Sequence, residues 1–201
     1  MRLATWNVNS LKVRLPHVLD WLAENPVDVL CLQETKQQDS DFPQAELQAA
    51  GYQSAFSGQK TYNGVAILSR TPGKDQQHGI PDLGDDQKRV IAATYGDIRV
   101  VDVYIPNGQS IDSDKYQYKL KWLTALHDWL QRELARYPKL VLLGDYNIAP
   151  EDRDVHDPKA WEGNVLVSEP LVSLCRSCVI DKVPRKLERP SDHTPVIVEL
   201  G

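Results

Sequence analysis

The chain has 201 residues and a mass of 22.7 kDa, a size at which a single domain with a sizeable hydrophobic core is expected. Its 41% hydrophobic and 25% charged residues argue against a disordered chain, and its net charge of −5 argues against a protein that coats nucleic acid through an overall positive field. Its apolar runs are shorter than the roughly 20 residues of a membrane span, and its N-terminus lacks the apolar segment of a signal peptide, so we expect a cytoplasmic protein.

The N-terminal half alternates strand and helix patterns. The apolar run at residues 27–32 is of the type found in strands buried on both faces, and it ends in Gln33 and Glu34. In chain order we expect a strand at 3–8, a helix at 11–22, a strand at 27–32, a short helix at 45–50 ended by Gly51, and strands at 52–56 and 64–69.

The C-terminal half begins with residues 71–88, whose Gly, Pro, Asp and Gln content predicts a surface excursion and not a domain boundary. Runs at 90–95 and 98–105 flank Gly96 and Asp97, which predicts a hairpin. We expect the longest helix at 113–137, with Tyr116, Leu120, Leu123, Leu126, Leu130 and Leu134 at helical spacing, a buried strand at 140–143, weak apolar runs at 165–167 and 171–174, and a final strand at 195–200.

The order of these elements predicts the fold class. Strands outnumber helices, and they are linked both by hairpins and by helices, which indicates an α/β arrangement of packed sheets with outer helices. No internal repeat interrupts the chain, so we expect one domain over residues 1–201. The three cysteines are too few for a disulfide framework, and Cys175 and Cys178 lack a second pair of zinc ligands nearby. We expect three reduced structural thiols, with redox chemistry as an alternative.

Polar side chains with ligand chemistry lie at the edges of predicted strands, mostly where an apolar strand gives way to polar residues. They are Asn7 and Asn9, Glu34, Tyr104, Asp145 with Asn147, and Asp192 with His193. Carboxylate and amide oxygens suit Mg²⁺ or its substitute Mn²⁺, and His and Cys are not spaced as in zinc sites, so we expect Mg²⁺. Each residue alone also has a plain structural explanation: a helix cap for Asn7, an ion pair with Lys36 for Glu34, a turn for Asp145, core packing for Tyr104 and a backbone contact for His193.

The combination of motifs is more specific than its members. WNVNS, LQET, YIPNG, GDYN and PSDH, in this order, resemble the exonuclease III family of apurinic/apyrimidinic endonucleases, within the metal-dependent endonuclease/exonuclease/phosphatase superfamily. The resemblance covers nearly the whole chain. WNVNSLKVR, YIPNG and ERPSDHTPV separate this family from the lipid and inositol phosphatases of the superfamily. The resemblance therefore implies double-stranded DNA, abasic or with 3′ ends, as the substrate of a monomeric enzyme.

The resemblance also implies a fold and a set of roles. The fold is a four-layered α/β sandwich of two mixed sheets with outer helices, which meet at one active-site edge. The implied metal-binding residues are Asn7, Glu34 as the principal ligand, Asp145, Asn147 and Asp192, with Asn9 as an outer contributor. The implied catalytic roles are water activation by Asp145, phosphate contact by Asn147 and Asn107, phosphate or leaving-group contact by Tyr104, and transition-state stabilisation by His193.

The chain departs from the family pattern after Pro170. Family members continue through a helix, a strand, an aromatic loop and an Arg-Ile-Asp-His segment, all of which are missing, and Asp181 does not fill the gap. We therefore expect an incomplete second sheet, a His193 without the aspartate that orients it, and a weaker grip on DNA. Either a deletion in the protein or a flexible part left out of the sequence explains the difference.

The leading hypothesis is a Mg²⁺-dependent DNA-repair nuclease that cuts 5′ to abasic sites and removes nucleotides from 3′ ends. One alternative is a catalytically impaired domain that binds metal or duplex DNA without turnover, and another is a phosphomonoesterase for small substrates. Despite the net charge, local basic residues can meet phosphates, and we expect a positive rim formed by Lys60, Lys88, Arg89 and Lys119, with Lys121 as a further candidate. The plain alternative is that these are solvated surface charges.

Overall fold

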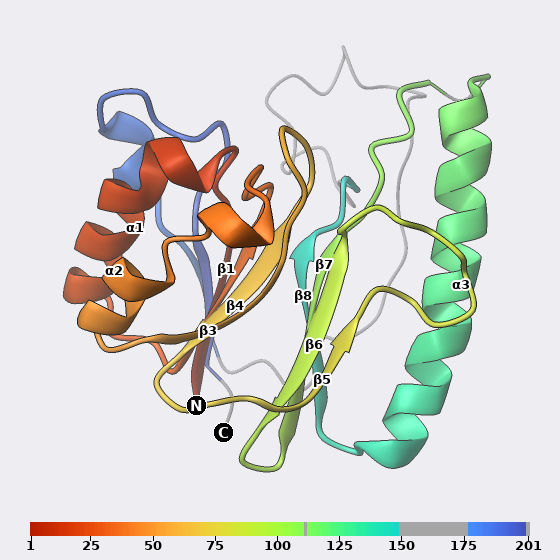
Figure 1. Ribbon diagram of the computed structural model, residues 1–201, viewed down its shortest axis with the longest axis horizontal. Helices are drawn as coiled ribbons and strands as arrows, with labels where there is room; N and C mark the ends of the chain where they lie inside the picture. Colours follow the sequence, from red (N-terminus) through yellow and green to blue (C-terminus); the bar gives the residue numbers. More distant parts are fainter. Residues whose placement is uncertain (111, 149–176, 200–201) are drawn as a thin grey trace.

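A computed structural model describes residues 1–110, 112–148 and 177–199 of the chain. Two β-sheets pack face to face, and helices cover their outer faces, so that the layers run helix, sheet, sheet, helix (Figure 1). One sheet has six strands in the order β3-β4-β2-β1-β10-β9, and the other has four in the order β5-β6-β7-β8. The prediction of a four-layered α/β sandwich with two mixed sheets is confirmed.

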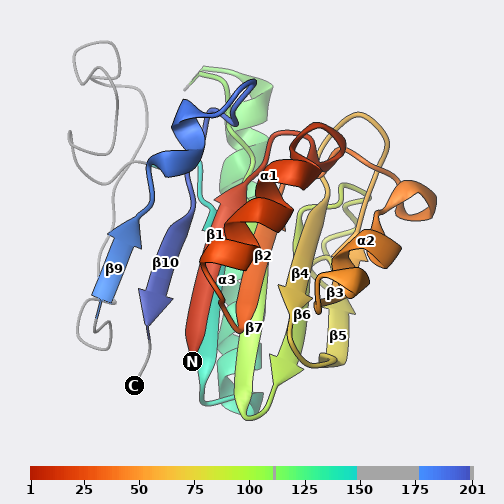
Figure 2. The same ribbon diagram turned by 90° about the vertical axis from the view of Figure 1, so that its left-hand side faces the viewer.

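The six-stranded sheet carries both ends of the described chain. β1 pairs in parallel with β2, and α1 provides the crossover that a parallel pair requires. Figure 2 shows α1 and α2 lying over the outer face of this sheet. Every residue of β2 is buried, because helices cover one face and the second sheet covers the other. Its strands are β1 (Arg2–Asn7), β2 (Val29–Gln33), β3 (Gln53–Ser57), β4 (Val65–Ser69), β9 (Ser177–Ile180) and β10 (Val196–Glu199), and its helices are α1 (Leu11–Glu24) and α2 (Gln44–Ala49).

The four-stranded sheet is covered by one long helix, α3 (Asp114–Arg136). Its strands are β5 (Lys74–His78), β6 (Val90–Tyr95), β7 (Ile98–Tyr104) and β8 (Leu140–Asp145). β7 runs parallel to β8, and α3 connects them. The Ser113 side chain accepts a hydrogen bond from Tyr116 N and so caps the N-terminus of α3. Two short 3₁₀ helices, η1 (Asp39–Asp41) and η4 (Val183–Lys186), complete the described elements.

Alternation along β7 shows how the layers are joined. Val100 packs into the core between the two sheets, whereas Val101 and Val103 pack against α3. Asp102 is fully buried and accepts a hydrogen bond of 2.7 Å from Gln33 Nε2 of the opposite sheet. The two sheets are therefore linked by a polar contact as well as by apolar packing.

Most of the predicted elements are confirmed, but the buried face of α3 differs from the leucine spacing. Leu120 and Leu134 are 42% and 43% exposed. The buried side chains at this face are Lys119, Trp122, Leu126, Trp129 and Glu133. Trp122 and Trp129 pack in the hydrophobic cluster beneath this helix together with Leu126, and Leu123 and Leu130 lie partly buried against it.

Two strands were not predicted. The segment at 71–88, expected to be a surface excursion, contains β5, an edge strand whose sequence KDQQH has no apolar alternation and four of whose five residues are exposed. Residues 177–180 form β9 and pair antiparallel with β10. The runs at 165–167 and 171–174, Cys175 and the expected gap after Pro170 lie outside the described residues. Within the described part, β8 is an edge of its sheet, and the expected incompleteness of the second sheet stays a prediction.

Two further expectations concern the interior and the membrane. Cys31 is a buried free thiol, and burial together with the nearby Asp102 raises its pKa, which fits a structural role. None of the helices in residues 1–110, 112–148 and 177–199 has the length and apolar character of a membrane span.

Candidate active site

The predicted site residues converge because of strand direction. β1 and β2 are parallel, as are β7 and β8, so the carboxyl ends of both pairs lie at one edge of the sandwich. β10 runs antiparallel to β1, and the loop before it therefore returns to the same edge. This edge holds Asn7, Glu34, Tyr104, Asp145, Asp192 and His193.

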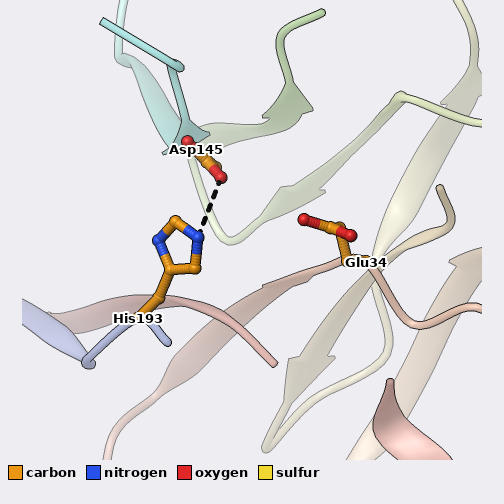
Figure 3. A group of neighbouring side chains, drawn as sticks. All are labelled: Glu34, Asp145 and His193. Atoms are coloured by element: carbon orange, nitrogen blue, oxygen red, sulfur yellow. Dashed lines mark ion pairs between the residues drawn. The ribbon is translucent and has the colours of Figure 1, made fainter. Parts of the chain in front are cut away.

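Glu34, Asp145 and His193 form the centre of the site. One ligand atom from each lies within 4.8 Å of the others, and Figure 3 shows the three side chains pointing toward one another. His193 Nε2 is 3.8 Å from Asp145 Oδ2 and 3.9 Å from Asp192 Oδ2. The structure thus brings together two carboxylates from different sheets and one imidazole.

Asn7 joins the two carboxylates. Its Nδ2 donates to Glu34 Oε1 and to Asp145 Oδ2, both at 2.8 Å, and its Oδ1 accepts the backbone N–H of Asn9. The amide nitrogen, and not the oxygen, therefore faces the carboxylates. In this structure the Asn7 amide nitrogen offsets the repulsion between the two carboxylates, and the metal-binding role that the resemblance implied stays a prediction.

Glu34 lies in an electrostatically favourable place for an anion. Lys36 Nζ is 2.9 Å from Glu34 Oε2 and 2.5 Å from Asn9 Oδ1. Burial raises the pKa of Glu34, but the hydrogen bonds from Lys36 and Asn7 and the charge of Lys36 outweigh burial, so the pKa lies below its usual value. The ion pair with Lys36, the plain structural explanation for Glu34, is present together with the predicted cluster.

Tyr104 is held as a neutral hydrogen-bond donor. Burial, followed by the charge of Glu34 and a hydrogen bond to it, raises the pKa of the Tyr104 phenol well above its usual value. The guanidinium of Arg89 lies 4.7 Å from the centre of the Tyr104 ring and donates to the Tyr104 carbonyl at 3.2 Å. The ring also packs against the core between the sheets, so its structural explanation and its place at the site both hold.

The turn after β8 fixes Asp145 and Asn147. Gly144 has φ 146°, and a Cβ there would lie 2.0 Å from the Val103 carbonyl oxygen, so glycine is required for the close approach of β7 and β8. Asp145 Oδ1 accepts the Asn147 N–H at 2.9 Å, which is the turn contact expected for this aspartate. Asn147 Oδ1 accepts from Asn107 Nδ2 at 3.0 Å, and Asn147 Nδ2 donates to the Ile105 carbonyl. Asn147 therefore lies beside the carboxylates without directing its oxygen at them.

The loop before β10 carries Asp192 and His193. Asn9 Nδ2 donates to Asp192 Oδ1 at 2.9 Å. Burial raises the pKa of Asp192, but that hydrogen bond and the nearby His193 and Arg185 lower it below its usual value. Among the described residues, Asp145 and Asp192 are the carboxylates within 4 Å of His193 Nε2. Asp181 instead accepts a hydrogen bond from Trp21 Nε1, in agreement with the expectation that it does not orient His193.

Sequence reasoning missed two residues that support this loop. Arg14 of α1 donates to the backbone carbonyls of Asn9, Arg189 and Pro190. The Ser191 hydroxyl donates to the Asn7 carbonyl at 2.7 Å and accepts the His193 N–H. Both lie inside the matched motifs WNVNSLKVR and PSDH, which was the available signal.

The expected basic rim is only partly present. Lys119 is 1% exposed, and its Nζ donates to the carbonyls of Asn147 and Asn107, so the expectation that it meets DNA phosphates is wrong. Arg89 is engaged with Tyr104, as described above. Lys60 and Lys121 are exposed, and Lys88 is partly exposed.

The donor set suits a small divalent cation that prefers oxygen ligands. The Glu34 and Asp145 side chains are 17% and 12% exposed, so both are shielded and still reachable. Two carboxylates and one imidazole, with Asp192 beside them, match hard-cation chemistry better than the sulfur-rich sets of structural zinc sites. The residues present therefore fit a bound metal ion.

The fold and this site define a class of proteins. Residues 4–193 match the endonuclease/exonuclease/phosphatase family, and the chain belongs to that family. The resemblance inferred from the motifs is confirmed.

Particular relatives are exodeoxyribonucleases and a DNA-repair nuclease. The chain is 33% identical to the exodeoxyribonuclease of Bacillus subtilis (strain 168), over 84% of this chain and 67% of that protein. It is 35% identical to exodeoxyribonuclease III of Haemophilus influenzae, over 77% and 60% of the two chains. It is 32% identical to the DNA repair nuclease APEX1 of Danio rerio, over 82% and 54%. The chain thus spans between about half and two thirds of the length of these relatives.

Solved structures show the same fold. The 3′-5′ exonuclease NExo of Neisseria meningitidis is 40% identical with a TM-score of 0.91, and NExo described as a 3′ phosphatase bound to a product DNA hairpin is 39% identical with a TM-score of 0.91. An AP endonuclease from Archaeoglobus fulgidus is 32% identical with a TM-score of 0.89. Each likeness covers 100% of this chain and 99% of the other.

Proposed function

We propose that this chain is a Mg²⁺-dependent DNA-repair nuclease that hydrolyses the phosphodiester 5′ to abasic sites and removes nucleotides from DNA 3′ ends. The observation that carries the proposal is the Glu34, Asp145 and His193 group, built at the edge where two sheets meet. The names of the relatives support DNA as the substrate. We further propose one cytoplasmic, monomeric domain over residues 1–201 that accepts Mn²⁺ in place of Mg²⁺.

The carboxylates divide between metal binding and proton transfer. Glu34, ionised and half-buried, would hold the ion together with Asp145 and Asp192. When bound, the ion supplies positive charge where the phosphodiester gathers negative charge. Asp145 is oriented by hydrogen bonds at both oxygens, from Asn7 and Asn147, and it is therefore the residue placed to accept the proton of the attacking water.

Hydrogen-bond donors surround the carboxylates of Glu34 and Asp145. The Tyr104 phenol stays protonated at neutral pH because of its raised pKa, so it can donate to a phosphate oxygen or to the leaving oxygen. Asn107 and Asn147 present side-chain amides to the same place from two loops. His193 approaches from the opposite sheet, where it can donate to a non-bridging oxygen. Together these groups stabilise a transition state of higher negative charge than the bound phosphodiester.

Duplex DNA would be held by local positive charge. Lys12, Lys36 and Lys60 line a groove of about 650 Å³, and Arg89 and Lys115 line a second of about 480 Å³ beside Asn107. A log–log plot of affinity against salt should have a slope of about −0.9 for each phosphate neutralised. Lys60→Ala and Arg89→Ala should each weaken binding of an uncleavable abasic duplex and make the slope shallower. Lys139→Ala, which removes an exposed lysine paired with Asp97, is the control and should change neither.

A second candidate is a domain that binds metal or duplex DNA without turnover. It is favoured by the surroundings of His193. In the described part of the chain, the carboxylates near His193 are Asp145 and Asp192. These are the same groups that would hold the ion, so neither is an additional aspartate that orients the imidazole. A third, a phosphomonoesterase, draws support from the solved relative described as a 3′ phosphatase.

One set of substrates separates the three. The chain is incubated with an abasic duplex, a 3′-recessed duplex, a 3′-phosphorylated duplex and a small phosphate ester, each with Mg²⁺ and with EDTA. The nuclease proposal requires cleavage of the first two that EDTA abolishes. Binding with no product supports the second candidate, and release of phosphate alone supports the third.

A further inference from the structure

A buried lysine lies beneath one half of the site. Lys119 of α3 is 1% exposed, although lysine is among the residues least often fully buried. Its Nζ donates to the Asn147 carbonyl at 2.7 Å and to the Asn107 carbonyl at 3.3 Å. Within the described residues no carboxylate lies within ion-pair distance of it, so backbone carbonyls are its main partners. The ammonium is thus placed between two loops and not in an ordinary salt bridge.

Those two loops carry the amides of the proposed phosphate contact. Asn107 follows β7 and Asn147 follows β8, and their side chains are hydrogen-bonded to each other at 3.0 Å. Asn147 has φ 47°, in the left-handed region, which asparagine adopts more often than most residues other than glycine. A hydrogen bond to its carbonyl from a fixed helix opposes relaxation of this turn. The position of the Asn107 and Asn147 side-chain amides therefore depends on Lys119 Nζ, which holds the backbone carbonyls of these two residues together.

The packing of the lysine stem supports a fixed position. Gly108 has φ +88°, and a Cβ there would lie 3.0 Å from Lys119 Cδ. The loop after β7 approaches the stem closely at a residue without a side chain. Lys119 is therefore held along its length as well as at its tip.

We propose that Lys119 is a positioning residue whose buried ammonium holds the Asn107 and Asn147 loops in the arrangement that the reaction uses. It touches no substrate and acts through the two asparagines. Its effect on turnover rests on the proposed function, whereas its effect on the loops is a property of the free chain. The two effects are measured separately.

Three variants isolate the ammonium. Lys119→Met keeps the apolar stem and removes the donors and the charge. Lys119→Arg keeps both the charge and the ability to donate to two carbonyls. Lys139→Met makes the same chemical change at an exposed lysine that is paired with Asp97 and lies outside the expected basic rim, and it is the matched control.

The first readout is NMR of the free chain without DNA or metal. The nuclear Overhauser contact between the side-chain amides of Asn107 and Asn147 should be present in the parent, Lys119→Arg and Lys139→Met chains. It should be lost in Lys119→Met. Retention of the contact in a folded Lys119→Met would overturn the proposal, as would its loss in Lys139→Met.

The second readout is the split between kcat and KM on an abasic duplex with Mg²⁺. Lys119→Met should lower kcat by about 10- to 100-fold, because a hydrogen bond to a charged group is lost, and should leave KM nearly unchanged. Lys119→Arg should recover most of kcat. If Lys119 merely filled space, restoring the charge and the donors would not be needed to recover kcat. Equal kcat in Lys119→Met and Lys139→Met contradicts the proposal.

Two further results are informative. If Lys119→Met does not fold, Lys119→Gln carries both readouts and should show a smaller loss in the same direction, and full parental values in it would refute the proposal. A parent chain that cuts no DNA refutes the proposed function, and the amide contact then decides the role of Lys119 alone.

Discussion

Glu133→Met tests whether α3 is locked to the second sheet by a buried ion pair. Arg99 Nε of β7 lies 2.8 Å from Glu133 Oε2, and the two side chains are 2% and 6% exposed. Removing the carboxylate leaves a buried guanidinium without its counter-charge, which costs about 3–5 kcal/mol of unfolding free energy. Because Arg99 Nη1 keeps hydrogen bonds to the Asp75 carbonyl and Thr94 Oγ1, we expect the lower part of that range, about 3–4 kcal/mol.

The assay is thermal and urea unfolding followed by circular dichroism. In a chain of this size 1 kcal/mol corresponds to about 2–4 °C, so Tm should fall by about 6–16 °C. Asp97→Asn is the control, since it breaks the Lys139–Asp97 pair, whose side chains are 67% and 71% exposed, and Tm should not change. Adding Arg99→Met to Glu133→Met should restore part of the loss. A Tm decrease no larger than that of Asp97→Asn would refute the reasoning.

Three other predictions concern pH and the loops. Because the pKa of Glu34 is lowered on folding, its ionised side chain stabilises the fold above its usual pKa of 4.5, and this stabilisation is lost as pH falls through the folded-state pKa. The unfolding free energy of the metal-free Glu34→Gln chain should therefore depend less on pH between about pH 3 and 6 than that of the parent. Burial raises the pKa of Asp102 well above 3.8, so its contribution to the free energy of unfolding declines as pH rises from there. The Asp102→Asn side chain can still accept the hydrogen bond from Gln33, and this variant should be at least as stable as the parent at pH 7. Marked destabilisation of the variant contradicts this. Arg14→Met should speed amide hydrogen exchange of His193 by about tenfold or more, and unchanged exchange would exclude Arg14 as the support of that loop.

Part of the site could be placed from the sequence because apolar runs indicate the strands that carry it. The run at 27–32 indicates a strand that ends at Glu34, and the run at 140–143 leads to Asp145, whereas His193 precedes its strand, β10. The three residues were predicted together from the matched motifs and the family that these motifs resemble. The edge strand β5 was missed because an exposed strand has no apolar alternation to detect.

The contacts of side chains could not be predicted in the same way. Spacing does not tell which end of the Asn7 amide faces the carboxylates, since this depends on the Asn9 N–H that its oxygen accepts. Lysine is usually a surface residue, and the burial of Lys119 depends on which face of α3 packs against the sheet, which the leucine spacing does not give. The ion pair between Lys36 and Glu34 was foreseen as an alternative to the site. The sequence did not show that the Glu34 carboxylate would take part both in this ion pair and in the group with Asp145 and His193.

The most direct test of the central claim is single-turnover cleavage of a duplex with one abasic site by the parent and by Asp145→Asn. Asp97→Asn, the same change at the opposite end of the same sheet, is the control. We predict that the parent and Asp97→Asn cut the strand 5′ to the abasic site at equal rates with Mg²⁺ and not with EDTA. Asp145→Asn should be slower by about 10²–10⁴-fold, the usual contribution of a general base. Parental rates in Asp145→Asn, or equal rates with and without EDTA, would contradict the assignment of this edge as a metal-dependent hydrolytic site.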